Sequence, residues 1–289
     1  MFKLIAMDMD GTLLNCYGDV SKENKEAISL ALSKNIEVVI ASGRIPNAIL
    51  STANKINANK YMISGNGAQV YDIQNDEIIY SNYLSKEKVL EIIEKCETNS
   101  MFYTIYTNDA ILTKTLNYNI LFYNSENKKN PEDKQINIKV VSNLQEYINE
   151  YQGEDFLKVV ICDSDESVFK NIINTLKTIE DVDVLEVSHL SKKIIQCENE
   201  NIEITYFYTE ITNKNVNKWT AIEKLIEKLD IKKEEVLTIG DNINDKEMIE
   251  NAGYGIVTGN GSQYMKEIAN EVVGTNDENG VAQAIMAHI

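Results

Sequence analysis

The sequence predicts an α/β protein with a parallel sheet, interrupted by an inserted α+β domain. The run at residues 2–7 is almost entirely apolar, as in a strand that is buried on both faces of a sheet. Apolar runs alternate with helical patterns in the first and last thirds of the chain, which indicates right-handed βαβ units. The middle third is instead rich in β-forming residues and is expected to form a separate unit.

The first third is expected to alternate three strands with two helices. Ser21 suits the N-cap of a helix whose apolar residues form one stripe, and Pro46 suits the first turn of the next helix. The three strands are expected at residues 2–7, 37–42 and 61–65.

The last third repeats this alternation. Apolar residues at helical spacing over residues 216–229 predict a helix, and a strand is expected at 235–240. A helix from about Asp245 and a strand at 253–257 follow, and two short helices are expected to end the chain.

The middle of the chain is expected to be the inserted domain. Its β-rich runs are interrupted by helical patterns at 85–96 and 166–176, and the polar stretch 124–134 is expected to be a loop. Residues 82–211 would therefore form the insertion, and residues 1–81 and 212–289 together the core.

Composition excludes several classes of function. The chain of 289 residues carries 28 Lys+Arg against 45 Asp+Glu, a net charge of −17. Such a chain has no bulk attraction for nucleic acid or for anionic membrane surfaces, so neither is an expected partner. A monomer or weak homodimer is expected.

Cysteine, histidine and the N-terminus point to the cytoplasm. Four cysteines lie far apart without a CxxC pair, and the chain has only two histidines, so zinc sites and a disulfide framework are not expected. No apolar stretch approaches a membrane span, and the first ten residues contain two aspartates where a signal peptide would be apolar.

The motif DMDGTLL, residues 8–14, carries the strongest chemical signal. Asp8 and Asp10 directly follow the first predicted strand, and ligands of parallel sheets bind at the carboxyl ends of the strands. Two neighbouring carboxylates repel each other, and a Mg²⁺ ion with its preference for oxygen ligands would relieve this repulsion. A solvated acidic turn is the plainer alternative.

A second acidic motif, GDNINDKEM, spans residues 240–248. Asp241 follows another predicted strand, and Asn244 and Asp245 lie at the expected start of a helix. Helix capping would explain Asn244 and Asp245, because Asn and Asp are favoured there, but it does not require Asp241. The two acidic motifs could converge above one sheet.

Two weaker elements could complete a phosphate pocket. The turn ASGR, residues 41–44, offers the hydroxyl of Ser42 and a close backbone approach at Gly43, although such turns are also common as plain structure. Lys218 lies near the start of a predicted helix. It could be an ordinary surface lysine, or it could balance the acidic residues and hold a phosphate.

These four motifs, in this order, resemble those of the haloacid dehalogenase (HAD) superfamily of phosphohydrolases. SGNGA at 64–68, EITNKNVNKW at 210–219 and NGVAQAI at 279–285 resemble the Cof-type subgroup, which carries a type IIB cap. The resemblance implies a Rossmann-like three-layer parallel-sheet core with an inserted α+β cap, and a Mg²⁺-dependent phosphatase acting on a small phosphorylated metabolite.

The resemblance also implies roles for individual residues. Asp8 would be the nucleophile that forms an aspartyl-phosphate, and Asp10 would be the general acid and then the general base. Mg²⁺ would be held by the Asp8 carboxylate, the Asp10 backbone carbonyl and Asp241, with Asp245 binding directly or through water.

The same resemblance assigns the remaining site residues. Four residues would bind the transferring phosphoryl group, namely Ser42, Gly43, Lys218 and Asn244. Arg44 and Asn66 would face the substrate.

The sequence departs from the family pattern in two places. Trp219, the only tryptophan of the chain, stands where the family usually has glycine, and it could shift the start of the helix or pack against the cap. The stretch 191–209 is longer than in typical relatives and could form an extra hairpin of the cap.

Two other functions remain open from the sequence. A phosphomutase would share the aspartyl-phosphate chemistry and return the phosphoryl group to a sugar. A non-catalytic phosphometabolite-binding protein would keep the fold without turnover, although every expected catalytic position holds a competent residue.

Overall fold

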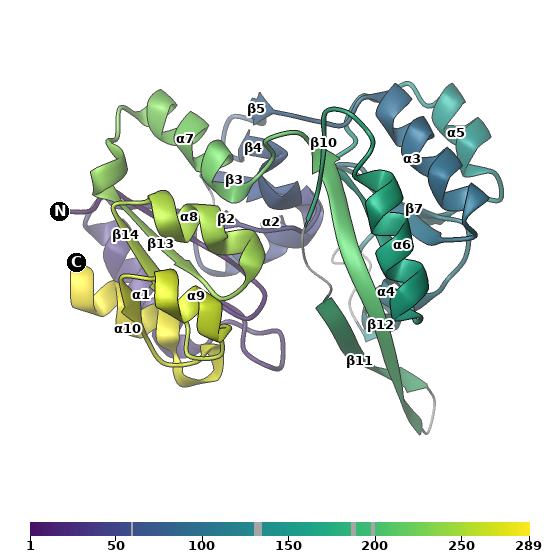
Figure 1. Ribbon diagram of the computed structural model, residues 1–289. Helices are drawn as coiled ribbons and strands as arrows, with labels where there is room; N and C mark the ends of the chain where they lie inside the picture. The colour runs from purple at the N-terminus through teal and green to yellow at the C-terminus, as the bar shows by residue number, and fades with distance from the viewer. Residues whose placement is uncertain (59, 130–134, 186–188, 198–199) are drawn as a thin grey trace. The chain divides into compact units, whose positions relative to one another are not determined.

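The computed structural model describes residues 1–289 apart from 59, 130–134, 186–188 and 198–199. The chain forms two compact units, which are described separately (Figure 1). Unit 1 comprises Met1–Ser81 and Val216–Ile289, and unit 2 comprises Asn82–Asn215.

Unit 1 is built on one sheet with the strand order β15-β14-β13-β1-β2-β3-β4-β5. The strands from β15 to β3 pair in parallel, and β4 and β5 are antiparallel. Their bounds are β1 Leu4–Met7, β2 Glu37–Ala41, β3 Tyr61–Ser64, β4 Gln69–Asp72, β5 Glu77–Ser81, β13 Val236–Gly240, β14 Tyr254–Val257 and β15 Glu271–Val272.

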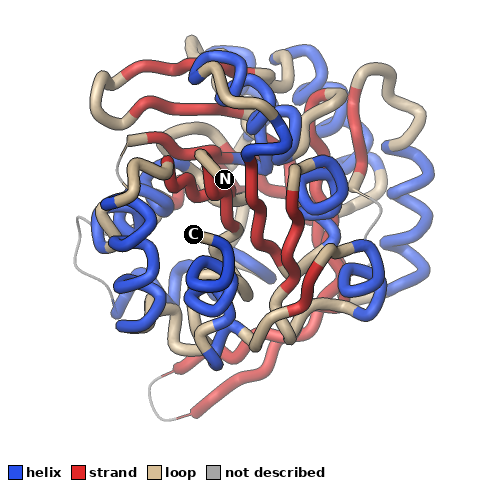
Figure 2. Tube along the Cα trace, turned by 90° about the vertical axis from the view of Figure 1, so that its left-hand side faces the viewer, coloured by secondary structure: helices blue, strands red, loops and turns tan. Residues whose placement is uncertain are grey.

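Helices cover both faces of this sheet, which gives unit 1 three layers (Figure 2). One face packs against α1 (Lys22–Ser33), α2 (Pro46–Lys55) and α10 (Gly280–His288). The other face packs against α7 (Lys218–Leu229), α8 (Lys246–Asn251) and α9 (Gln263–Ile268). The predicted Rossmann-like α/β core is therefore confirmed.

Local signals in the sequence explain where the helices of unit 1 begin. The Ser21 side chain accepts a hydrogen bond from the N–H of Asn24 at the start of α1, and Pro46 occupies the first turn of α2. The Asn217 side chain caps α7 by accepting from the N–H of Thr220 at 2.9 Å. These caps fix the ends of the loops that leave the sheet.

Unit 2 contains a second, mainly antiparallel sheet with the strand order β10-β12-β9-β6-β7-β8. Strand β11 pairs with β12 outside this path. The bounds are β6 Phe102–Tyr106, β7 Ile111–Thr113, β8 Ile138–Val140, β9 Lys158–Asp163, β10 Val182–Val184, β11 His189–Cys197 and β12 Glu200–Asn213.

The helices of unit 2 lie on both faces of its sheet. Helices α3 (Lys86–Thr98), α5 (Leu144–Glu150) and α6 (Glu166–Leu176) share an apolar core with one face. Helix α4 (Tyr118–Lys129) lies on the other face, where Asn119 bonds to Tyr106. Unit 2 therefore has the α+β composition expected for the insertion.

Unit 2 differs from the sequence-based expectations in one loop and in its C-terminal boundary, and agrees with them in one hairpin. Residues 124–129 belong to α4, so the loop predicted there is wrong, and 130–134 lie outside the described residues. The antiparallel pairing of β11 with β12 confirms a hairpin in the stretch 191–209, and its extra length relative to typical relatives stays a prediction. Because β12 stays in the sheet as far as Asn213, unit 2 ends at Asn215 and not at the expected residue 211.

In the part of the chain that the structure describes, every helix is too short or too polar to cross a bilayer.

Candidate active site

Asp8 lies at the carboxyl end of β1, in the middle of the sheet of unit 1. Its N–H donates to the carbonyl oxygen of Ile239 at 2.9 Å, so the chain is still held to β13 at this point. Parallel pairing aligns Met7 with Ile239 and with Ile40. The residues that follow β1, β13 and β2 therefore leave the sheet at the same edge.

Lys218 joins the two acidic motifs. Its Nζ lies 2.5 Å from Oδ1 of Asp8 and 2.5 Å from Oδ1 of Asp245. The side chain of Lys218 is fully buried at the first turn of α7, and both carboxylates are buried as well. The structure thus excludes the alternative of an ordinary surface lysine.

Asp241 and Asp245 form the second acidic turn, directly after β13. Oδ2 of Asp245 accepts the N–H groups of Asp241 at 2.9 Å and of Asn242 at 3.1 Å, so Asp245 also stabilises the turn, as its capping alternative predicted. Thr12 of the first motif donates to Oδ1 of Asp241 at 3.0 Å. Carboxylate oxygens of Asp8, Asp241 and Asp245 lie within 4.8 Å of one another.

The carboxylate cluster carries more negative charge than Lys218 offsets. Burial raises the pKa of Asp8 well above its ordinary value, opposed by Lys218 and reinforced by Asp245 and Asp241. Burial and the neighbouring Asp245 raise the pKa of Asp241 to about 7. Oxygen ligands with uncompensated negative charge are the donor set of a hard divalent cation, so these residues fit a metal such as Mg²⁺.

Asp10, the second aspartate of the first motif, pairs with Arg44. Two hydrogen bonds join the side chains, from Nη2 of Arg44 to Oδ1 at 2.5 Å and from Nε to Oδ2 at 2.7 Å. This paired geometry fixes the orientation of the carboxylate more firmly than a single contact would. The side chain of Asp10 is 57% exposed, so it remains open to solvent and to a ligand.

Ser42, Gly43, Asn66 and Asn244 gather at the turns beyond β2, β3 and β13. The Ser42 hydroxyl is buried and accepts the N–H of Arg44 at 3.2 Å. Asn66 adopts a left-handed conformation with φ 58°, and its Oδ1 accepts from Nδ2 of Asn244 at 3.1 Å. A Cβ on Gly43 would lie 2.8 Å from that same oxygen, so a larger residue would collide with Asn66.

Trp219 leaves the start of α7 undisturbed. Its side chain is 6% exposed and packs in the apolar core of unit 1 with Tyr61, Ile63 and Val70. Asn217 still caps the helix and Lys218 still reaches both carboxylates. The tryptophan therefore serves as a packing residue of unit 1.

Two residues that bond to the backbone of the first motif, Thr258 and Asn260, were not predicted from the sequence. Nδ2 of Asn260 donates to the carbonyl oxygen of Gly11 at 2.8 Å, and the hydroxyl of Thr258 donates to the same oxygen at 3.3 Å. Both residues follow β14, whose carboxyl end lies at the same edge of the sheet. A polar turn after that strand was the signal that could have identified them.

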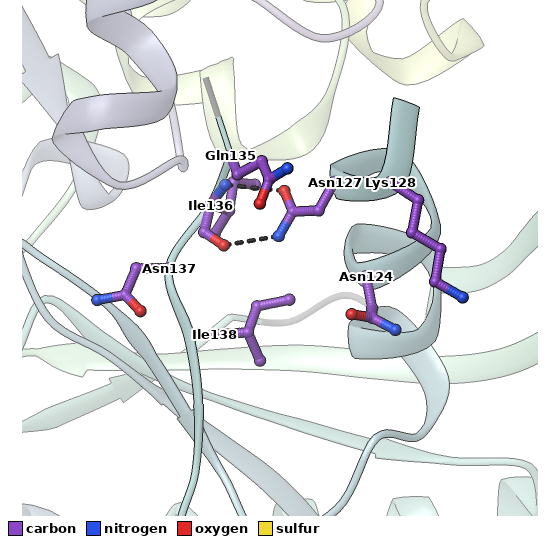
Figure 3. Close-up of a pocket in the computed structure, with 7 residues that line it drawn as sticks. All are labelled: Asn124, Asn127, Lys128, Gln135, Ile136, Asn137 and Ile138. Atoms are coloured by element: carbon purple, nitrogen blue, oxygen red, sulfur yellow. Dashed lines mark hydrogen bonds between the residues drawn. The ribbon is translucent and has the colours of Figure 1, made fainter. Parts of the chain in front are cut away.

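Unit 2 contains a pocket of its own, with a volume of about 470 Å³ (Figure 3). Amide side chains dominate its lining, and the amide of Asn127 bonds to both the N–H and the carbonyl of Ile136. None of the site residues predicted from the sequence lines this pocket.

Fold and site together define a class of protein. A parallel sheet collects two acidic turns and one buried lysine at its carboxyl edge, and a second unit is inserted into the chain. This arrangement suits an α/β enzyme that uses a metal to handle an anionic ester.

The chain belongs to the haloacid dehalogenase-like hydrolases, because the model of that family matches residues 5–285. It is 30% identical to phosphatase YwpJ of Bacillus subtilis, over 99% of each chain. It is 28% identical to the 5-amino-6-(5-phospho-D-ribitylamino)uracil phosphatase YcsE of the same organism, over 98% of this chain and 94% of that protein.

Solved structures agree with this assignment. A haloacid dehalogenase-like hydrolase from B. subtilis superposes with a TM-score of 0.82 at 27% identity, over the whole of both chains. A subclass IIB sugar phosphatase of the superfamily has the same fold, with a TM-score of 0.73 at 22% identity over 99% of this chain and 98% of that one. The protein is thus a phosphatase of the Cof-type subgroup, a phosphoric monoester hydrolase.

Proposed function

We propose that this phosphatase depends on Mg²⁺ and hydrolyses a small phosphorylated metabolite through a phosphoryl intermediate on Asp8. The observation that carries this proposal is the contact of the buried Asp8 carboxylate with Lys218, next to Asp241 and Asp245. A buried carboxylate at a strand end is held rigidly, and a nearby ammonium lets a phosphate dianion approach it.

Two displacements at phosphorus complete the reaction. An oxygen of Asp8 attacks phosphorus, and the bond from phosphorus to the ester oxygen breaks while Asp10 donates a proton to the leaving alcohol. Asp10 then takes a proton from water, whose oxygen attacks phosphorus and releases phosphate from Asp8. The exposure of the Asp10 side chain to solvent supports its role as the proton carrier.

The phosphoryl group would be held by residues on several turns. Lys218 supplies the positive charge, while Ser42, the backbone at Gly43 and Asn244 supply hydrogen bonds. The close approach of Gly43 to Asn66 supports a phosphate-binding role for the Gly43 backbone. It leaves no room for a side chain at position 43, so the backbone N–H there can be approached closely by an anion. We assign Arg44 and Asn66 to the substrate side of the phosphate.

Mg²⁺ would be held by Asp8, Asp241 and Asp245, together with the backbone carbonyl of Asp10. When bound, Mg²⁺ neutralises part of the negative charge that the carboxylates and the phosphoryl oxygens bring together. The raised pKa values of Asp8 and Asp241 support this assignment, since they reflect burial together with the negative charge of neighbouring carboxylates.

We propose that unit 2 is the cap that selects the substrate by contacting the leaving group. Two tyrosines of this unit, Tyr103 and Tyr106, are buried, and Tyr103 belongs to the apolar core, so these two rings serve as packing residues.

A sugar phosphate or a phosphorylated cofactor precursor is the substrate class that we favour. The relative YcsE is named for a phosphorylated ribitylaminouracil, and a structural neighbour is named as a sugar phosphatase. A panel of phosphorylated metabolites that includes both kinds of compound would identify the substrate.

Release of p-nitrophenol from p-nitrophenyl phosphate tests the proposed function. We expect turnover that requires Mg²⁺, stops with a chelator and returns on adding the metal again. Asp8→Asn should abolish the activity while circular dichroism shows an intact fold. Activity without a divalent metal, or an unchanged rate in Asp8→Asn, would contradict the proposal.

A further inference from the structure

Gly11, the residue after Asp10, has a backbone conformation and surroundings that only glycine fits. It has φ +83°, and a Cβ at this position would lie 2.5 Å from Oδ2 of Asp241. Both facts require glycine here, and glycine has the freest backbone of all residues. Hydrogen bonds to the backbone at Gly11 would therefore restrain the segment that directly follows Asp10.

The carbonyl oxygen of Gly11 receives that restraint from the turn after β14. It accepts hydrogen bonds from Nδ2 of Asn260 at 2.8 Å and from the hydroxyl of Thr258 at 3.3 Å. The N–H of Thr258 donates to the carbonyl oxygen of Gly240 at 3.0 Å, directly before Asp241. The turn thus ties the first acidic motif to the second.

A further asparagine, Asn276, holds the side chain of Asn260. Oδ1 of Asn260 accepts the N–H of Asn276 at 3.0 Å, and Nδ2 of Asn276 donates to the carbonyl oxygen of Leu14 at 2.8 Å. We call Thr258, Asn260 and Asn276 the clamp. Its three side chains bond to two backbone carbonyls of the segment from Gly11 to Leu14. Within this segment the N–H of Leu14 also donates to the carbonyl oxygen of Met9 at 2.9 Å.

We propose that Asn260 is a positioning residue that holds Asp10 in place for proton transfer. The inference rests on the proposed function, because it assigns Asp10 the protonation of the leaving group. Asn260 acts through the carbonyl of Gly11, which belongs to the peptide that joins Gly11 to Thr12, and so restrains the backbone one residue beyond the Asp10 Cα. Arg44 holds the carboxylate of Asp10, and the clamp restrains the backbone that directly follows Asp10.

Because Asp10 is assigned the protonation of the leaving group, a change in its position should alter how the rate depends on the basicity of the leaving group. p-Nitrophenolate is a stable anion and departs with little help from an acid, whereas phenolate and more basic leaving groups gain more from protonation. Displacement of a catalytic group by about 1 Å can cost about 100-fold in rate. A loosened Asp10 should therefore slow the basic leaving groups selectively.

The test measures kcat/KM for aryl phosphates of increasing leaving-group pKa, from p-nitrophenyl to phenyl to p-methoxyphenyl phosphate. We expect a shallow dependence on leaving-group pKa in the wild type and a steep one in Asp10→Asn. Asn260→Ala should steepen the dependence, lowering kcat/KM for phenyl phosphate about 10-fold more than for p-nitrophenyl phosphate. Asn276→Ala should shift it in the same direction.

Asn251→Ala is the matched control. Asn251 is also exposed and bonds to a backbone carbonyl, that of Glu247 at 2.7 Å, but it lies at the end of α8. We expect the wild-type dependence in this variant. Rates that fall equally for all three esters in Asn260→Ala, or do not fall, would overturn the positioning role.

Failure of the proposed function gives a different pattern. If the wild type hydrolyses none of the esters, or if Asp8→Asn remains active, the proposed function fails. If the wild type is active, Asp8→Asn is inactive, and the Asn260→Ala dependence equals that of the wild type, only the positioning role fails.

Discussion

Lys218 contacts Asp8 across 210 positions of the sequence, with 2.5 Å between Nζ and Oδ1. The same ammonium lies 2.5 Å from Asp245, so one buried cation serves both acidic motifs. Its pKa is raised, because these two carboxylates outweigh the effect of burial. The lysine is therefore expected to stay charged at neutral pH.

Lys218→Met should abolish activity and destabilise the protein without metal. In the proposed function the ammonium stabilises the transferring phosphoryl group, so its loss should lower kcat by at least about 100-fold. It also leaves buried carboxylates without their partner, which costs about 3–5 kcal/mol.

Thermal unfolding with and without MgCl₂ checks the second effect. We expect Mg²⁺ to restore much of the lost stability of Lys218→Met but none of its activity. Lys224→Met is the control, since Lys224 pairs with Glu227 on the exposed side of the same helix. A Lys218→Met variant with wild-type stability and rate would refute the assigned role.

Asp241→Asn should weaken Mg²⁺ binding more than it disturbs the fold. The amide keeps an oxygen that can accept from Thr12 but removes one negative charge from the metal ligands. Calorimetric titration with MgCl₂ measures the affinity, and we expect a loss of about 10-fold or more. Asp19→Asn, at an exposed aspartate that pairs with Lys55, should bind the metal like the wild type.

Stabilisation by Mg²⁺ should increase with pH. The pKa of Asp241 is about 7 in the folded protein against an ordinary value of 3.8, so the folded state holds this proton more tightly than the unfolded state. The free energy of unfolding without metal therefore falls as the pH rises between these two values.

Mg²⁺ competes with that proton, so its effect grows as Asp241 ionises. We expect MgCl₂ to raise Tm more at about pH 8 than at about pH 5.5, with Asp241→Asn showing a smaller difference. Equal shifts of Tm at both pH values in the wild type would argue against Asp241 as a metal ligand.

The core of the site could be predicted because its residues directly follow buried strands. Asp8 and Asp241 each follow an apolar run, and parallel pairing of β1 with β13 brings such positions to one edge of the sheet. Lys218 needed the family resemblance, since a single lysine at a helix start has no distinctive local pattern.

Other features depend on contacts that no local pattern encodes. The pairing of Arg44 with Asp10 and the contact of Asn260 with Gly11 join segments far apart in the sequence. Helix α4 was missed because its apolar residues do not fall on one stripe and several asparagines and lysines follow them.

The central claim is that a phosphoryl group is transferred to Asp8. The most direct measurement is the mass of Asp10→Asn after brief reaction with p-nitrophenyl phosphate and MgCl₂ and quenching in acid. We expect a gain of one phosphoryl group that fragmentation places on Asp8, because this variant transfers the group but hydrolyses the intermediate slowly. The double variant Asp8→Asn, Asp10→Asn should gain none. A phosphoryl group on another residue, or an equal gain in the double variant, would contradict the account.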